Sequence, residues 1–401
     1  MERRMESRTH EHRLGALRRS NTARCALHLR DIGPASVSEV AQATGLSRPT
    51  VEAAFSDLAG RGLVATNETN GHRGAGRPAR VSRFVGNAGY VAGVDVGFAG
   101  IRVILADLSG TVVARVEHRG EVPADGGMRI DAVRALIADA LRVADAPAER
   151  LLFAHVGVTG LVRADGRIWI SHGFPDWEGV DVGGELAKQI GCAVSLDNDV
   201  NLAALAEQRL GAAHLADDML FVFIGGQISA GLVLDGRLRR GSHNAAGELG
   251  DASLRVPLDE RGHLVWRSAP SARSVFEMAD AGDAGAVAEV ETFVAGLADT
   301  VVVLAQTIDP DLVVIGGPMS RAGDRLVTPL NERVAGLVSL PFAPTIVASR
   351  LGIDSIAFGA LSRAFDLSSE LVYGVHEVPM PALRRPDGGD ALDSEGKDFE
   401  W

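Results

Sequence analysis

From residue 90 onward, short apolar stretches of strand length alternate with longer stretches of helical periodicity. The first strand, Tyr90–Val96, is followed at hairpin spacing by strands at 101–106 and 111–117. Further strands are predicted at 151–158, 194–197, 218–224, 230–234, 312–315 and 344–348. Helices are predicted at 129–143, 182–190, 199–210, 285–307, 321–338 and 353–366. This alternation predicts an α/β body, which leaves the first 83 residues as a separate unit.

Composition excludes several classes of protein. A chain of 401 residues is long enough for two or three domains and a large core. We find no run of about 18 apolar residues, so no membrane contact is expected. The charged segment Met1–Arg8 does not resemble a secretory signal. Cys25 and Cys192 are far apart and are expected to be reduced, which favours a cytoplasmic protein.

Charge is distributed unevenly along the chain. Residues 1–83 contain 14 arginines, no lysine and eight acidic residues, a net charge of +6. Because the whole chain carries −12, the remainder carries −18. A basic module on an acidic body indicates that one end meets a polyanion, although a basic surface without a partner gives the same count.

The basic module has the pattern of a helix-turn-helix. A helix over 12–30 ends at Gly33-Pro34, and Ser36–Glu39 is a capping box that opens a short second helix. Thr44-Gly45-Leu46 has the length of the turn between the two helices of such a motif. Ser47 is a good N-cap for the third helix, which has Pro49 in its first turn.

The third helix is predicted to read DNA. Val51, Phe55 and Leu58 recur at helical spacing and are expected to face the core. A hydroxyl, a small residue and an arginine near the helix N-terminus suit the major groove of DNA. The residues expected to contact DNA from this helix are Ser47, Arg48, Thr50 and Ala53.

A glycine- and arginine-rich stretch, Gly71–Arg80, follows a strand that starts at Leu63 and is predicted to be a wing. Glycines such as Gly76 let the backbone approach a groove, and Pro78 keeps the chain extended so that Arg77 can enter the minor groove. The same stretch is also compatible with a flexible linker. In the wing interpretation, Arg73 and Arg80 neutralise phosphates.

Several ordered segments of the chain resemble the ROK family, named for its repressors, open reading frames and kinases. The resemblance runs from about Arg13 to Phe365 and implies a two-lobed actin-like ATPase fold behind a winged helix-turn-helix. The segments that carry it are Val156–Val162, Leu196–Glu207, Ala246–Gly250, Asp309–Gly317 and the motif Gly76-Arg77-Pro78.

Both phosphate loops depart from the pattern of the family's kinases. The family's first loop reads Asp-x-Gly-Gly-Thr, whereas this chain has Phe98 and Ala99 in place of the second Gly and the Thr. Its second loop, Gly225–Gly231, carries Gln227 and Ser229 where the family has small residues. Because phosphates are bound by bare backbone amides, these side chains predict that ATP binding and phosphoryl transfer are lost. No cofactor is expected.

The resemblance also implies a zinc site and a sugar site. Asp251 stands at the position of the family's zinc-binding His, and no cysteine lies between it and Glu277, so no metal is expected. The residues that match the family's sugar ligands are Asn198, Asp199 and Glu248, with Asp251 in place of the His. Asp199 matches the catalytic carboxylate and is interpreted as vestigial. Asn198-Asp199 has a second interpretation as the N-cap of a helix. Gly173 stands where the family often has an Asn.

These observations predict a disordered segment at 1–10, a winged helix-turn-helix at 11–83, a kinase-like sensing domain at 88–372 and a disordered acidic tail at 373–401. The expected function is a transcriptional regulator, a repressor of carbohydrate-related genes, that binds a double-stranded DNA operator as a homodimer or homotetramer. A sugar or sugar phosphate is the expected effector. Two alternatives stay open: an active sugar kinase, and a regulator without a small-molecule effector.

Overall fold

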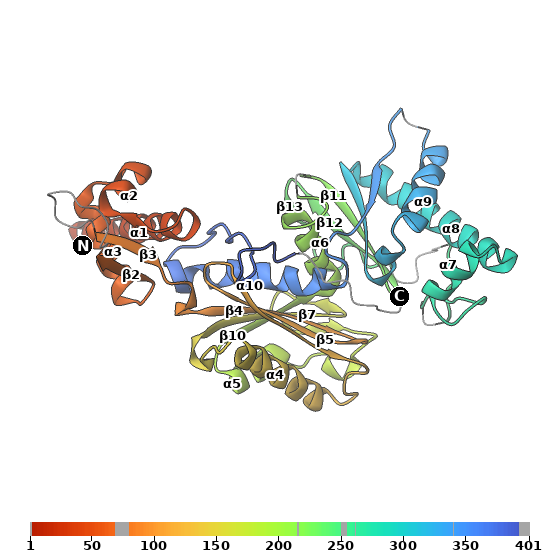
Figure 1. Cartoon of the computed structure of the whole chain (residues 1–401), viewed down its shortest axis with the longest axis horizontal. Coiled ribbons are helices and arrows are strands. Elements are labelled where there is room, and N and C mark those ends of the chain that lie inside the picture. Colours follow the sequence, from red (N-terminus) through yellow and green to blue (C-terminus); the bar gives the residue numbers. More distant parts are fainter. Residues whose placement is uncertain are drawn as a thin grey trace.

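The computed structural model describes residues 2–68, 80–214, 216–249, 255–260, 262–339 and 341–392. It has three parts: a small N-terminal head, a body of two lobes, and a C-terminal segment that crosses between them (Figure 1). We call residues 2–84 the head, 90–373 the body and 374–392 the strap. Within the described residues, no helix is long and apolar enough to cross a membrane.

The head consists of three helices and a small antiparallel sheet of order β1-β3-β2. Its core is formed by apolar residues of all three helices, among them Leu29, Val51 and Leu58. Its elements are α1 (Glu2–Asp31), β1 (Ala35–Ser36), α2 (Val37–Thr44), α3 (Arg48–Gly60), β2 (Val64–Glu68) and β3 (Arg80–Phe84).

Local signals in the sequence account for the boundaries of the head helices. Ser36 and Glu39 form the predicted capping box at the start of α2, and Gly45 ends α2 with a positive φ of 69°. The Ser47 side chain accepts a hydrogen bond from the Thr50 amide and so caps α3. The α1 helix begins at Glu2, whereas residues 1–10 were expected to be disordered. Glu, Arg and Met, which favour helices, dominate its first turns.

The first lobe is built on a five-stranded sheet of order β10-β7-β4-β5-β6. Strands β4, β5 and β6 form an antiparallel meander, and β7 and β10 continue the sheet in parallel with β4. Helices α4 and α5 cover one face (Figure 1). The elements are β4 (Tyr90–Gly97), β5 (Gly100–Asp107), β6 (Val112–Arg119), α4 (Gly126–Val143), β7 (Leu151–Val158), β8 (Leu161–Val162), β9 (Ile168–Ile170), α5 (Val182–Ile190) and β10 (Ala193–Asn198).

The second lobe has a sheet of order β13-β12-β11-β14-β15, which packs on α8 and α9. Its elements are β11 (Met219–Ile224), β12 (Ile228–Leu234), β13 (Arg237–Leu238), α7 (Ala272–Asp280), α8 (Ala284–Ile308), β14 (Leu312–Gly316), α9 (Asp324–Leu337) and β15 (Thr345–Ala348). Every strand and helix predicted in the body is present; most ends shift by a few residues, and α10 continues to Tyr373 beyond its predicted end at 366. Helix α7, strand β13 and the short hairpin β8–β9 were not predicted.

Two helices join the lobes. Helix α6 (Asp199–Arg209) packs on the second sheet, α10 (Ser355–Tyr373) packs on the first, and the two pack on each other. Glycines allow the close approach: a Cβ at Gly359 would collide with the Leu202 carbonyl oxygen of α6, and one at Gly93 would collide with the backbone of α10. The α10 helix therefore touches the first sheet, α6 and, at its C-terminal end, the head (Figure 1).

The expectation of a disordered tail from residue 373 is wrong for the strap. The Val112 amide donates to the Arg384 carbonyl oxygen at 2.8 Å, and the Arg384 amide donates to the Gly110 carbonyl oxygen at 3.1 Å. Ala391 is fully buried and Val378 nearly so. The strap lacks a regular period because it pairs through single bridges and scattered apolar residues, and such contacts leave no repeating pattern in a sequence.

Candidate functional site

The predicted sugar-site residues meet where β10 ends and α6 begins. The Asn198 side-chain oxygen accepts a hydrogen bond from the Asn201 amide at 2.9 Å, so the helix-cap interpretation is confirmed. Its amide nitrogen donates to the Gly160 carbonyl oxygen at 3.0 Å and lies 3.5 Å from Oε1 of Glu248. Asn198 therefore links the cap to a residue 50 positions further along the chain.

Asp199 is buried, and the protein engages both of its oxygens. Thr159 Oγ1 donates to Oδ2 at 2.8 Å, and the Val200 amide donates to Oδ1 at 2.9 Å. Burial raises the pKa of Asp199 to about 7 despite the Thr159 hydrogen bond, and the charges of Asp95 and Glu248 raise it further.

Glu248 is the second carboxylate of the site. Burial raises its pKa, and the charge of His172 lowers it. Three of the four predicted sugar ligands, Asn198, Asp199 and Glu248, thus lie together, whereas Asp251 lies outside the described residues. The arrangement offers an amide and two carboxylates, which suit the hydroxyls of a polyol.

Asp95, at the end of β4, adds a third carboxylate to which the sequence analysis gave no role. Arg102 lies directly opposite it on β5 and donates from Nη1 to Oδ2 at 3.0 Å. Burial raises the pKa of Asp95 to about 6, although Arg102 lowers it. The hairpin turn at Phe98-Ala99 fixes which residues of β4 and β5 lie opposite each other, so the pairing of Asp95 with Arg102 could have been predicted from the sequence. The positive charge beside Asp95 is therefore the guanidinium of Arg102.

Phe98 lies at the tip of the β4–β5 turn, with 55% of its surface exposed. Its ring packs on Phe174 with centroids 5.4 Å apart. A Cβ built on Gly173 would lie 3.0 Å from Cε1 of Phe98 and closer still to Cζ. The absence of a side chain at 173 therefore leaves the space that the Phe98 ring occupies. Trp177 is buried against Phe174.

The second phosphate-type loop is covered by another segment. Gly262 lies against the Gln227 side chain, since a Cβ there would be 3.6 Å from Nε2. The Gly226 carbonyl oxygen accepts a hydrogen bond from the Leu264 amide at 2.8 Å. The Gly225 amide donates to the Gln227 carbonyl oxygen at 3.0 Å, so this amide, of the kind that binds phosphates, is already bonded within the protein. Among the described residues, no group of three or more His, Cys, Asp or Glu side chains is arranged to hold a metal ion.

The head residues expected to contact DNA lie together at the start of α3. Ser47, Arg48 and Ala53 are exposed, and Thr50 is half-buried, with its Oγ1 2.8 Å from Oγ of Ser47. Arg80 is exposed at the start of β3, beside the loop that connects it to β2. The other expected contacts, Arg73, Gly76, Arg77 and Pro78, lie outside the described residues.

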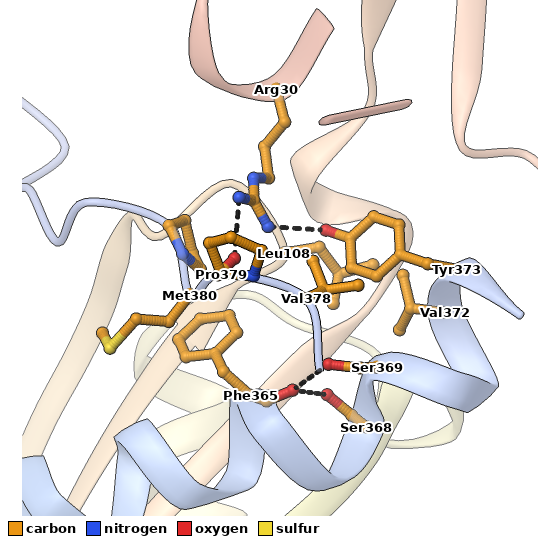
Figure 2. Close-up of a pocket in the computed structure, with 11 residues that line it drawn as sticks. Arg30, Leu108, Phe365, Ser368, Ser369, Val372, Tyr373, Val378, Pro379 and Met380 are labelled. Carbon is orange, nitrogen blue, oxygen red and sulfur yellow. Dashed lines mark hydrogen bonds between the residues drawn. The ribbon is translucent and has the colours of Figure 1, made fainter. Parts of the chain in front are cut away.

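A polar latch ties the head to the body, and sequence reasoning missed it. Figure 2 shows the side chain of Arg30, from α1, reaching a crevice between α10 and the strap. Arg30 Nη1 donates to the Tyr373 hydroxyl at 3.2 Å, and Nη2 donates to the Pro379 carbonyl oxygen at 2.8 Å. Arg61, at the end of α3, donates to the Leu371 carbonyl oxygen at 3.1 Å. Two of these acceptors belong to α10 and one to the strap, all far from the head in sequence, so no local pattern could have indicated the contacts.

A model of the ROK family matches residues 91–263 and 260–365. A glucokinase of Thermotoga maritima is 30% identical over 307 residues, which cover 67% of this chain and 95% of the glucokinase. A xylose repressor of Bacillus subtilis is 23% identical over 361 residues, covering 83% of this chain and 91% of the repressor. A solved ROK family transcriptional regulator, a homologue of the Escherichia coli Mlc protein, has a TM-score of 0.67 at 19% identity and covers 89% of this chain and 98% of its own.

The matches to the regulators and to the glucokinase cover different shares of the chain. The stretch from residue 91 to the C-terminus is shorter than 83% of the chain. The matches to the repressor and to the solved regulator therefore include part of the head. The glucokinase matches over 95% of its own length with only 67% of this chain.

Proposed function

The chain belongs to the ROK family, and on that premise we propose that it is a DNA-binding transcriptional regulator. In this proposal residues 11–83 are a winged helix-turn-helix and residues 88–372 are a kinase-like domain that senses a sugar. The regulator represses carbohydrate-related genes and binds a double-stranded operator as a homodimer or homotetramer. The match to a xylose repressor, which covers 83% of this chain and includes part of the head, supports this.

The observation that carries the proposal is the head itself. Two short capped helices joined by a glycine turn present Arg48 and Ala53 outward, while the hairpin β2–β3 extends beside them. The head is rich in arginine on an otherwise acidic chain. An exposed helix start of this kind, with a basic hairpin, fits a major groove and its flanking phosphates.

The state of the body supports sensing rather than catalysis. In a kinase of this type, Asp199 would accept the proton of the attacking hydroxyl, and backbone amides would hold the phosphates. Here Asp199 is already bonded to Thr159, Asp95 is paired with Arg102, and Phe98 and Gln227 occupy the two loops. A sugar hydroxyl can still donate to the carboxylates, so ligand recognition does not require phosphoryl transfer.

Helix α10 provides a route from the ligand site to the head. Its middle packs on α6, which begins at Asp199, and its last residue, Tyr373, bonds Arg30 of the head. A sugar that prefers one arrangement of the lobes would shift α10, and with it the head, between DNA-competent and incompetent states. Sugar binding and DNA binding are coupled in this way because the sugar binds the two arrangements of the lobes with different affinities.

An active sugar kinase is the second candidate, and the 30% identity to a glucokinase favours it. Two assays on one preparation of the full-length protein distinguish the two functions. Genomic DNA fragments selected on the protein should yield a preferred duplex, and Arg48→Ala should weaken its binding, whereas Arg142→Ala, in an exposed ion pair on α4, should not. Turnover of ATP with glucose or xylose, or the lack of any preferred duplex, would refute the proposal.

A further inference from the structure

Building on the proposed sensor function, we propose that Phe98 is a ligand-contacting residue. Its ring forms an aromatic platform beside the sugar-site residues and selects a neutral, unphosphorylated sugar over a sugar phosphate. The proposal rests on three observations: the packing of Phe98 with Gly173, the carboxylates around it, and the covering of both loops that bind phosphate in related kinases.

The first observation is the fit between Phe98 and Gly173. The ring is held from behind by Phe174, which stacks in turn on Trp177 and on the guanidinium of Arg129, 4.2 Å from the ring centroid. This support fixes the ring while 55% of the side chain stays exposed. Because any side chain at position 173 would meet the ring, an Asn there and the Phe98 platform exclude each other in this arrangement.

The second observation is the position of this ring relative to the polar ligands. Gly173 lies two residues after Ser171, whose Oγ donates to the Thr159 carbonyl oxygen at 2.6 Å, and Thr159 in turn donates to Asp199 at 2.8 Å. Asp95, three residues before Phe98, lies opposite Gly157 on β7, and Gly157 lies opposite Asp197 on β10, two residues before Asp199. The exposed ring thus belongs to the same site as the three carboxylates, and it adds an apolar surface to their acceptors. A pyranose or pentose ring matches both features: its apolar C–H face fits the aromatic ring, and the hydroxyls at its edge fit the carboxylates.

The third observation concerns charge. A phosphate group carries close to two negative charges and needs cations or free backbone amides. Asp95, Asp199 and Glu248 face such a group with carboxylates, and Arg102 is engaged with the first of them. In the second loop, the Gly225 amide is already bonded to the Gln227 carbonyl oxygen, at 3.0 Å. A neutral sugar avoids this repulsion, because its hydroxyls donate to the same carboxylates.

The test is isothermal titration calorimetry on the full-length protein with D-glucose, D-xylose and glucose 6-phosphate. We expect at least one neutral sugar to bind, and glucose 6-phosphate to bind at least tenfold more weakly than that sugar. Phe98→Ala should weaken binding of the neutral sugar about tenfold or more, and Phe98→Trp should retain it. Gly173→Asn should weaken binding as well, because it displaces the ring.

Phe342→Ala is the matched control, since Phe342 is equally exposed, at 56%, but lies in the loop before β15. It should leave sugar binding unchanged. Equal binding by Phe98→Ala and the wild type, tighter binding of glucose 6-phosphate, or no binding of either neutral sugar would each overturn the inference. Binding of the selected duplex, measured on the same samples, reports on the proposed function separately, so the two can fail independently.

Discussion

Replacing Asp199 by Asn should change how the stability of the protein depends on pH. Burial raises the pKa of Asp199 from an ordinary value of 3.8 to about 7 in the folded protein. The folded state therefore binds a proton more readily than the unfolded chain between these values, so stability falls as pH rises through this window. The Asn side chain keeps the shape but has no charge to bury.

The size of the effect follows from the change in the pKa of Asp199. One pKa unit corresponds to about 1.4 kcal/mol, so the raised pKa destabilises the wild type by about 2 kcal/mol at pH 5, where Asp199 is ionised only in the unfolded chain, and by about 4 kcal/mol at pH 8.5, where it is ionised in both states. The change in hydrogen bonding to Thr159 and to the Val200 amide is common to both pH values and cancels in the comparison. The stability of Asp199→Asn relative to wild type should thus rise by about 2 kcal/mol between pH 5 and pH 8.5.

Scanning calorimetry of the full-length wild type and variant measures this difference. For a body of this size, each kcal/mol corresponds to about 2 °C in the melting temperature, so the gap should widen by several degrees from pH 5 to pH 8.5. Asp125→Asn, a change at the exposed N-cap of α4, is the matched control for removing a carboxylate. Parallel pH profiles of wild type and Asp199→Asn would refute the reasoning about the buried carboxylate.

Three further predictions concern the head, the latch and the lobe junction. Arg77→Ala should weaken binding of the selected duplex and lower the salt dependence by about one unit of slope; unchanged affinity in a salt titration would remove the wing argument. Arg30→Ala breaks two hydrogen bonds of a buried charged donor, each of about 1.5–3 kcal/mol, so hydrogen exchange of α1 and the strap should speed up. Arg30→Lys should not restore slow exchange, because it lacks the fork geometry. Gly359→Ala should lower the melting temperature, because the added methyl group would push α10 away from α6. Gly336→Ala, in open space on α9, should instead raise stability by up to about 1 kcal/mol. Equal melting temperatures of the two variants would contradict this packing.

The lobe sheets and most helices were predictable because their signals are local. A capping box such as Ser36–Glu39, a glycine turn such as Gly45, and the period of an apolar stretch each act within a few residues. The same holds for the start of α6, where Asn198 both caps the helix and joins the site. The strap was missed for the opposite reason, since its contacts are isolated and made with distant strands.

The amino-acid order alone determined which residue types enter the ligand site: the pair Asn198-Asp199, the Glu248 carboxylate, and a phenylalanine in a phosphate loop. Tertiary structure alone decided what these residues do there. It brought Thr159 onto Asp199 across 40 positions, set Phe98 over Gly173, and closed Arg30 on Tyr373 across 343 positions. Local propensity encodes helices and turns, whereas a contact between distant segments exists only after the lobes have packed and the loop-closure entropy has been overcome.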